Sequence, residues 1–199
     1  MALEKINRIS GKGVFVSGND VDTDRIIPAR YLKCVTFDGL GEFLFQDVRF
    51  TEDGTKTKHV LNDEKYKDAN IMIVESNFGS GSSREHAPQS IKRAGFDAII
   101  GESFAEIFYG NSLTLGIPCL EASKEQIQEI AAAVEANPDT IIDIDIENAS
   151  VSINGKTFQL ALKATAKEAL LSGMWDAIAE LLANSEKVDK TVAKLPYLA

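Results

Sequence analysis

The sequence is poor in the residues that hold metals and build disulfide frameworks. It has two cysteines and two histidines in 199 residues. Cys34 and Cys119 lie far apart, and no C-x-x-C pair occurs, so a disulfide framework is not expected. A complete zinc or iron–sulfur site needs three or four clustered ligands. We therefore expect no such site within this chain alone, and we interpret both cysteines as packing residues.

Long apolar runs and an excess of basic charge are missing as well. No run approaches the ~20 residues that a membrane-spanning helix needs, and Met1-Ala2-Leu3-Glu4-Lys5 lacks the pattern of a signal peptide. The formal net charge of −9 argues against nucleic acid and anionic membranes as partners. We expect a cytoplasmic protein in a reducing setting, of a length that suits one domain or one domain with an extension.

What the chain does have is a stretch rich in glycine and serine between an apolar run and a helical pattern. Asn77-Phe78-Gly79-Ser80-Gly81-Ser82-Ser83-Arg84-Glu85-His86-Ala87 follows Ile71-Met72-Ile73-Val74. Glycine permits positive φ and the close approach of a ligand. The first turn of a helix offers free N–H groups and the positive end of the helix dipole. Together with Arg84, this pattern predicts a small carboxylate site in which a serine hydroxyl can do chemistry.

The same residues allow an interpretation without a ligand. Ser82-x-x-Glu85 is a capping box, which explains both side chains structurally. A plain cap requires neither the Gly-x-Gly before it nor the arginine and histidine after it. A Rossmann fingerprint would need glycine in place of Arg84, a Walker loop would need lysine, and a nucleophile elbow would need glycine two residues after a serine.

An aspartate-rich segment lies upstream of this stretch. Asp20, Asp22 and Asp24 imitate the start of a calcium-binding EF-hand loop, but Arg25 and Tyr31 stand where glycine and glutamate are required. A turn in which aspartate side chains bond backbone N–H groups is the better interpretation. Pro28 then suits the start of a short helix that runs through Leu32.

Two further local patterns carry expectations. His59 lies in a polar stretch, residues 51–68, and is expected to be solvated. Ser103-x-x-Glu106 is a second capping box and predicts the start of another helix.

The order of the patterns predicts an α/β fold. Apolar runs at 13–16, 71–74, 97–101 and 117–121 alternate with helical patterns, which favours parallel strands. The last third differs. Residues 140–146 alternate as a half-buried strand does, Asn154-Gly155 marks a hairpin turn, and 165–171 and 175–182 are predicted helices.

Taken together, the motifs resemble a known family. Asp20-Val21-Asp22-Thr23-Asp24-Arg25-Ile26-Ile27-Pro28, with the serine-rich stretch, resembles the small subunits of 3-isopropylmalate dehydratase, a family similar to the swivelling C-terminal domain of aconitase. Ser103-Phe104-Ala105 and Phe108-Tyr109-Gly110-Asn111 also match, whereas Ser80 stands where some relatives carry cysteine. The resemblance runs from Gly13 to about Leu182. It implies an aconitase-like swivelling domain over residues 1–199, layered β/β/α with a mostly parallel sheet flanked by helices, and a C-terminal helical extension.

The resemblance also implies a function. The chain would be one half of a two-chain hydro-lyase of leucine biosynthesis, in which the large partner subunit carries a [4Fe–4S] cluster and this chain binds none. The reaction would move a hydroxyl from C2 to C3 of isopropylmalate, a small dicarboxylate, through 2-isopropylmaleate. Ser82 would be the base that takes the carbon-bound proton, and Ser83 and Arg84 would hold substrate carboxylate. The segment Tyr31, Leu32, Lys33, Cys34 and Val35 would lie near the variable substituent.

Elementary chemistry supports this division of labour, and alternatives remain open. Removing hydroxide from an unactivated carbon needs a Lewis acid, and the chain lacks the ligands for one. Glu85 and His86 fit orienting roles, or a cap and a packed ring, better than direct catalysis. A related hydro-lyase acting on homoaconitate, citraconate or dimethylmaleate is one alternative. A non-catalytic module that holds a dicarboxylate in residues 79–84 is another.

Overall fold

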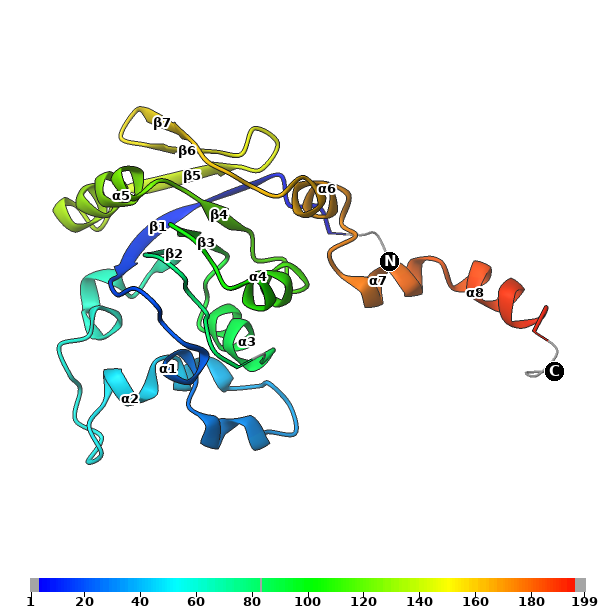
Figure 1. The fold of residues 1–199 in the computed structure, drawn as a ribbon, viewed down its shortest axis with the longest axis horizontal. Coiled ribbons are helices and arrows are strands. Elements are labelled where there is room, and N and C mark those ends of the chain that lie inside the picture. Colours follow the sequence, from blue (N-terminus) through cyan, green and yellow to red (C-terminus); the bar gives the residue numbers. More distant parts are fainter. Residues whose placement is uncertain (1–3, 83, 196–199) are drawn as a thin grey trace.

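One seven-stranded sheet organises the molecule. The computed structural model describes residues 4–82 and 84–195 (Figure 1). The strand order is β4-β3-β2-β1-β5-β6-β7. Parallel pairs join β1 (Arg8–Val16), β2 (Ala69–Val74), β3 (Ala98–Gly101) and β4 (Cys119–Glu121). Antiparallel pairs add β5 (Ile141–Asp145), β6 (Ser150–Ile153) and β7 (Lys156–Gln159). Because β5 and β6 reverse direction in turn, β6 runs the same way as β1 to β4.

Helices connect the parallel strands and cover both faces of the sheet. α3 (His86–Arg93) follows β2, α4 (Glu106–Leu113) follows β3, and α5 (Lys124–Ala136) follows β4. In Figure 1, α3 and α4 lie together on one side of the parallel strands, and α5 crosses the other side, where it contacts β1. The predicted α/β fold, with the sheet flanked by helices, is confirmed.

Burial explains why the strand patterns could be read from the sequence. β2 and β3 have helices on both faces, and the runs Ile71–Val74 and Ala98–Ile100 are fully buried, as strands of a covered parallel sheet usually are. β5 instead alternates exposed and buried residues. The cap of α5 also follows the sequence, because Ser123 and Gln126 form a complete capping box.

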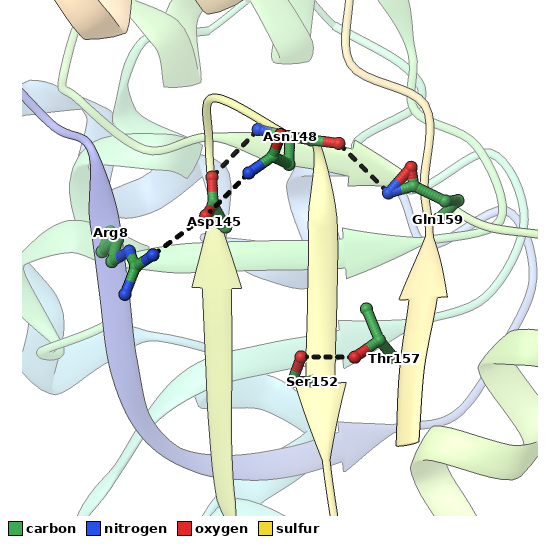
Figure 2. Close-up of polar contacts among 6 residues, drawn as sticks. All are labelled: Arg8, Asp145, Asn148, Ser152, Thr157 and Gln159. Carbon is green, nitrogen blue, oxygen red and sulfur yellow. Dashed lines mark hydrogen bonds and ion pairs between the residues drawn. The ribbon is translucent and has the colours of Figure 1, made fainter. Parts of the chain in front are cut away.

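Polar contacts hold the antiparallel half together (Figure 2). Asp145, at the end of β5, accepts hydrogen bonds from the backbone and side-chain nitrogens of Asn148 at 2.9 and 3.1 Å. It also pairs with Arg8 of β1 at 3.3 Å. Asn154 and Gly155 both have positive φ, 50° and 79°, as a type I′ hairpin turn requires. The predicted Asn-Gly hairpin is confirmed.

A long connection between β1 and β2 folds over the carboxyl ends of these strands. It contains two short α-helices, α1 (Thr23–Ile26) and α2 (Gln46–Arg49). It also contains 3-10 turns at Ala29–Lys33 (η1), Leu40–Phe43 (η2), Val60–Asn62 (η3) and Glu64–Tyr66 (η4). The short helix predicted after Pro28 is therefore a 3-10 helix.

The expectation that His59 is solvated was wrong. Its ring lies 5.4 Å from that of buried Phe45, and its Nδ1 accepts a hydrogen bond from Leu61 N at 3.2 Å. Burial, together with the charges of Arg49 and Arg25, lowers the pKa of His59 to about 4. The polar composition of 51–68 did not reveal that this segment returns onto Phe45.

The C-terminal helices leave the sheet. α6 (Ala164–Ser172) packs Leu170 into the core and ends at Gly173, whose φ is 85°. α7 (Ala177–Ala183) and α8 (Ser185–Val192) then extend away from the body in Figure 1. They expose Ile178 (72%), Leu181 (62%) and Leu182 (58%). α8 was not predicted. No helix in the described ranges has the length and apolarity to cross a membrane.

Candidate active site

Two loops meet at the carboxyl ends of β1 and β2. Because these strands are parallel neighbours, the chain leaves both at one edge of the sheet, where α/β proteins commonly bind ligands. Backbone bonds join the loops: Asp20 N to Ser76 O at 2.9 Å, Gly79 N to Val21 O at 2.8 Å and Thr23 N to Ser80 O at 2.8 Å. The aspartate-rich and serine-rich motifs thus form one unit, which we call the serine–arginine corner (20–24 and 77–82 with 84–85).

Glycine is required at the base of this corner. Gly79 has φ +78°, and a Cβ there would lie 2.2 Å from Cγ of Phe108. Phe78 is fully buried, with its ring edge-on to that of Phe108 at 5.3 Å. The loop can therefore press closely on α4, which fixes its position.

A helix begins at Glu106, as predicted, but the second predicted capping box does not form. α4 has Ala105 at its N-cap position without a side-chain cap bond. The Ser103 hydroxyl instead accepts a hydrogen bond from Asn77 N at 2.8 Å. A loop 26 residues away in sequence uses this acceptor, which satisfies a backbone donor of the corner itself.

Ser82 is exposed, and it does not cap α3. The helix begins at His86, four residues later, and its N-cap residue, Glu85, makes no side-chain cap bond. The Glu85 carboxylate accepts from Gln89 Nε2 at 2.8 Å instead, so the capping-box interpretation of Ser82 and Glu85 was wrong. The Ser82 carbonyl accepts from Oγ1 of buried Thr23 at 3.0 Å, which fixes the backbone while the residue faces solvent.

Arg84 makes a bidentate ion pair inside the corner. Its Nη1 and Nη2 donate to Oδ1 and Oδ2 of Asp24 at 2.6 and 2.7 Å. The Arg84 side chain is only 13% exposed, against 56% for Asp24. The hydrogen bonds from Arg84, reinforced by its charge, hold the pKa of Asp24 below its usual value. The guanidinium is thus already arranged for a carboxylate.

Sequence reasoning missed Asp24 as the partner of Arg84. The two residues are 60 positions apart, and nothing local to either indicates the pair. The available signal was that both belong to motifs at the ends of adjacent parallel strands.

The predicted substituent segment, residues 31–35, lies on the same connection but is not in polar contact with the corner. The Tyr31 ring stacks on that of Phe43 at 4.1 Å, whereas Lys33, Cys34 and Val35 are exposed. Leu32 is partly buried against the core. Within the described parts of the chain, no hydrogen bond joins these residues to Ser82 or Arg84. Ser83 lies outside the described residues.

His86 links this connection to the corner. Its ring meets that of Phe37 edge-on, with centroids 5.1 Å apart. A ring packed in this way fits an orienting role. Phe37 follows the 31–35 segment by two residues, so the exposed segment leads directly to the helix that carries the corner.

The cysteines differ from each other. Cys119 is buried in β4, as predicted, and burial raises the pKa of its thiol to about 12. Cys34 is exposed, so its prediction as a packing residue was wrong: the chain turns outward where η1 ends at Lys33. Among residues 4–82 and 84–195, no group of three His, Cys, Asp or Glu side chains is placed to hold a metal ion.

Comparisons with known proteins place these features in a family. A family model, the aconitase C-terminal domain, matches residues 3–125. The chain is 53% identical to the 3-isopropylmalate dehydratase small subunit of a strain of Thermus thermophilus, over 98% of this chain and 97% of that protein. It is 46% identical to the small subunit of the same name from Synechocystis, over 98% and 96% of the two chains. The crystal structure of 3-isopropylmalate dehydratase from Methanocaldococcus jannaschii superposes with a TM-score of 0.65 at 28% identity, covering 90% of this chain and 99% of that one.

Proposed function

Because this chain belongs to the family of 3-isopropylmalate dehydratase small subunits, which contain the aconitase C-terminal domain, we propose that the serine–arginine corner is the small-subunit half of the active site. The chain is a hydro-lyase component that acts in leucine biosynthesis. The reaction isomerises 2-isopropylmalate to 3-isopropylmalate by dehydration and rehydration through 2-isopropylmaleate. One observation supports the assignment most directly: exposed Ser82 lies two residues before a guanidinium arranged for a carboxylate.

Ser82 is the proton acceptor in this proposal. A serine hydroxyl is a weak base at neutral pH, so its negative form needs stabilisation. The positive charge of Arg84 and the free N–H groups at the start of α3 supply that stabilisation at the same corner. The proton that Ser82 takes from carbon returns to the intermediate when the hydroxyl is added at the neighbouring carbon.

Arg84, with Ser83, holds the substrate carboxylate. Arginine has five N–H donors, of which Asp24 uses two, one on each terminal nitrogen. The ion pair with Asp24 fixes the plane of the guanidinium, and this plane sets the direction of the three remaining N–H donors. Asp24 therefore acts as a positioning residue: it sets the orientation in which Arg84 meets substrate.

The large subunit completes the site. Removal of hydroxide from C2 requires a Lewis acid, and the chain's two cysteines, one of them buried, do not fit as ligands of a cluster. We assign the [4Fe–4S] cluster to the partner subunit, where it would supply the Lewis acid for the leaving hydroxyl. Free thiols at Cys34 and Cys119 fit a cytoplasmic, reducing setting.

The segment Tyr31 to Val35 is the proposed determinant of substrate choice. Two residues after its exposed end, Phe37 packs against His86, which follows the corner in sequence. A substrate panel of homoaconitate, citraconate and dimethylmaleate tests the alternative that a related hydro-lyase reaction is catalysed. Preference for one of these over isopropylmalate would replace the substrate assignment and leave the corner's role intact.

Ser82→Ala in the assembled two-subunit enzyme tests the proton-transfer role. We predict that kcat falls ~10²- to 10⁴-fold while KM stays within about threefold, as for a lost general base. Ser80→Ala is the matched control, because Ser80 is in the same loop and, among the described residues, its hydroxyl makes one long contact, 3.4 Å to Asp20 O. Unchanged turnover in Ser82→Ala would instead support a non-catalytic dicarboxylate-binding module.

A further inference from the structure

A pocket lies at the carboxyl end of α3, away from Arg84. Its volume is about 490 Å³, and its lining includes Arg49, Lys67 and Arg93, with Glu42 as its acidic side chain. The chain as a whole carries a formal charge of −9, so a local excess of basic side chains runs against the average composition. The partners of these three cations therefore decide whether the pocket can attract an anion.

Arg49 is a half-buried cation with neutral partners. Its Nε donates to Asn62 Oδ1 at 3.0 Å, and its Nη1 donates to Leu44 O at 3.1 Å. Within the described residues, no carboxylate lies within 4.0 Å of it. Burial lowers the pKa of Arg49. Because burying an unpaired cation costs free energy, an anion that enters this pocket is favoured.

The other two cations are exposed and only weakly neutralised. Arg93 donates to the neutral amide of Gln89 and lies over the ring of Phe37 at 5.5 Å. Lys67 pairs with Glu64 at 3.2 Å, but both side chains are more than half exposed, so this pair contributes little. Both cations can therefore turn toward a ligand at low cost.

The lining of the pocket also includes apolar side chains. Leu44, Tyr66 and Phe96 are buried there, and Leu61 is partly exposed. A cavity of this size, lined by both apolar and charged side chains, is typical of small-molecule sites. The carboxylate of Glu42 and the carbonyl end of α3 oppose a multiply charged anion. The chemistry therefore matches a ligand with one charged end and an apolar body.

We propose that the pocket bounded by Arg49, Lys67 and Arg93 binds a small aliphatic carboxylate at the opposite end of α3 from the serine–arginine corner. α3 has eight residues, so the two ends are about 12 Å apart. Phe37 contacts both Arg93 and His86, so one side chain touches both ends of the helix. This site goes beyond the proposed function, because none of its lining residues belongs to the corner.

The test uses the full chain, labelled with nitrogen-15, and three probes titrated by NMR. Pentanoate has both the charge and the apolar chain, acetate has only the charge, and pentan-1-ol has only the chain. We expect pentanoate to shift the amides of Leu61, Tyr66 and Phe96 with a Kd of about 1 mM, and the other two probes to bind at least tenfold more weakly.

Substitutions at exposed positions keep the fold intact while they remove the charge. Lys67→Gln with Arg93→Gln should raise the Kd of pentanoate at least fivefold, and the neighbouring control Lys65→Gln should leave it within twofold. Equal binding of pentanol, equal binding of acetate, or equal effects of the two sets of substitutions would overturn the proposal. The proposal would also be overturned if pentanoate shifted only amides of the corner and these shifts were lost in Arg84→Lys.

Discussion

At the scale of single residues, the corner depends on one arginine whose shape lysine does not reproduce. Arg84 is clamped by Asp24 through two short bonds and is almost enclosed. A lysine ammonium is a point charge, so it can satisfy neither that clamp nor a substrate carboxylate bidentately. The geometry of the corner therefore depends on the planar shape of the Arg84 guanidinium as well as on its charge.

Arg84→Lys should raise KM roughly 10- to 100-fold in the assembled enzyme, because a charge-assisted bidentate contact contributes about 1.5–3 kcal/mol. Steady-state kinetics with isopropylmalate measure this effect. Arg8→Lys is the control, since Arg8 pairs with Asp145 on the antiparallel half of the sheet. A KM equal to that of the unsubstituted enzyme would show that Arg84 does not bind substrate.

The lowered pKa of His59 leads to a separate prediction about how stability depends on pH. Its pKa in the folded chain is about 4, below the ordinary 6.5, so the unfolded chain binds a proton more readily. The stability contributed by neutral His59 is thus complete above pH 6.5 and is lost as the pH falls toward 4. Allowing for partial exposure, we expect a loss of about 1 to 2 kcal/mol between pH 7 and 4.5.

Denaturant unfolding of His59→Asn at the two pH values isolates this contribution. Asparagine can still accept the hydrogen bond from Leu61 N but does not titrate. The variant should lose less stability on acidification than the unsubstituted chain. An equal loss in both, or a titration of His59 near pH 6.5 by NMR, would contradict the burial of a neutral ring.

At the scale of elements, the C-terminal helices contribute little to the core. The buried apolar residues end at Leu170, and the last anchor before α7 is Trp175, whose Nε1 donates to Glu4 O at 2.9 Å. α7 and α8 follow this anchor and extend away from the body (Figure 1). Their large apolar side chains are exposed. Removing both helices should therefore leave the body of the protein folded.

Ending the chain after Trp175 should change the thermal midpoint by less than about 3 °C, because little apolar surface of the body loses cover. Adding Trp175→Ala to the shortened chain should destabilise it by about 1–3 kcal/mol, because the indole packs against Gly116. Calorimetry compares the two. A large drop on shortening alone would mean that α7 and α8 support the core.

The elements also show which features were predictable from the sequence. β2 and β3 were predicted correctly, because burial on both faces gives continuous apolar runs. The capping box of α5, formed by Ser123 and Gln126, is a local pattern. Ser82 and Ser103 match the same capping pattern, but their backbone or hydroxyl groups bond to residues 59 and 26 positions away. Long-range partners decide such cases, and a single sequence does not display them.

The same limit applies to exposure. His59 is in a polar segment, yet its ring lies against that of Phe45. Cys34 is the opposite case: cysteine is usually buried, but here it follows the end of η1 and is exposed to solvent. Each of the two motifs of the corner could be found in the sequence because its own residues are contiguous. The central contact of the corner, between Arg84 and Asp24, could not, because it joins the two motifs through the pairing of β1 with β2.

At the scale of the whole molecule, our proposal is that the chain presents half of a catalytic site at one edge of its sheet. Parallel strands bring the two motifs together, and a close approach at Gly79 seats the loop on α4. Family membership supplies the reaction, and our proposal assigns the Lewis acid to the large subunit. We therefore expect neither chain to be active alone.

The decisive measurement is the absorbance of 2-isopropylmaleate formed from 3-isopropylmalate by this chain alone, by the cluster-bearing large subunit alone, and by the two mixed. We predict a signal only in the mixture, saturating as this chain is titrated against the large subunit, and a signal at least ~10²-fold weaker when Ser82→Ala replaces it. Robust turnover by the isolated chain, or full turnover by the large subunit without it, would contradict a site shared between two polypeptides.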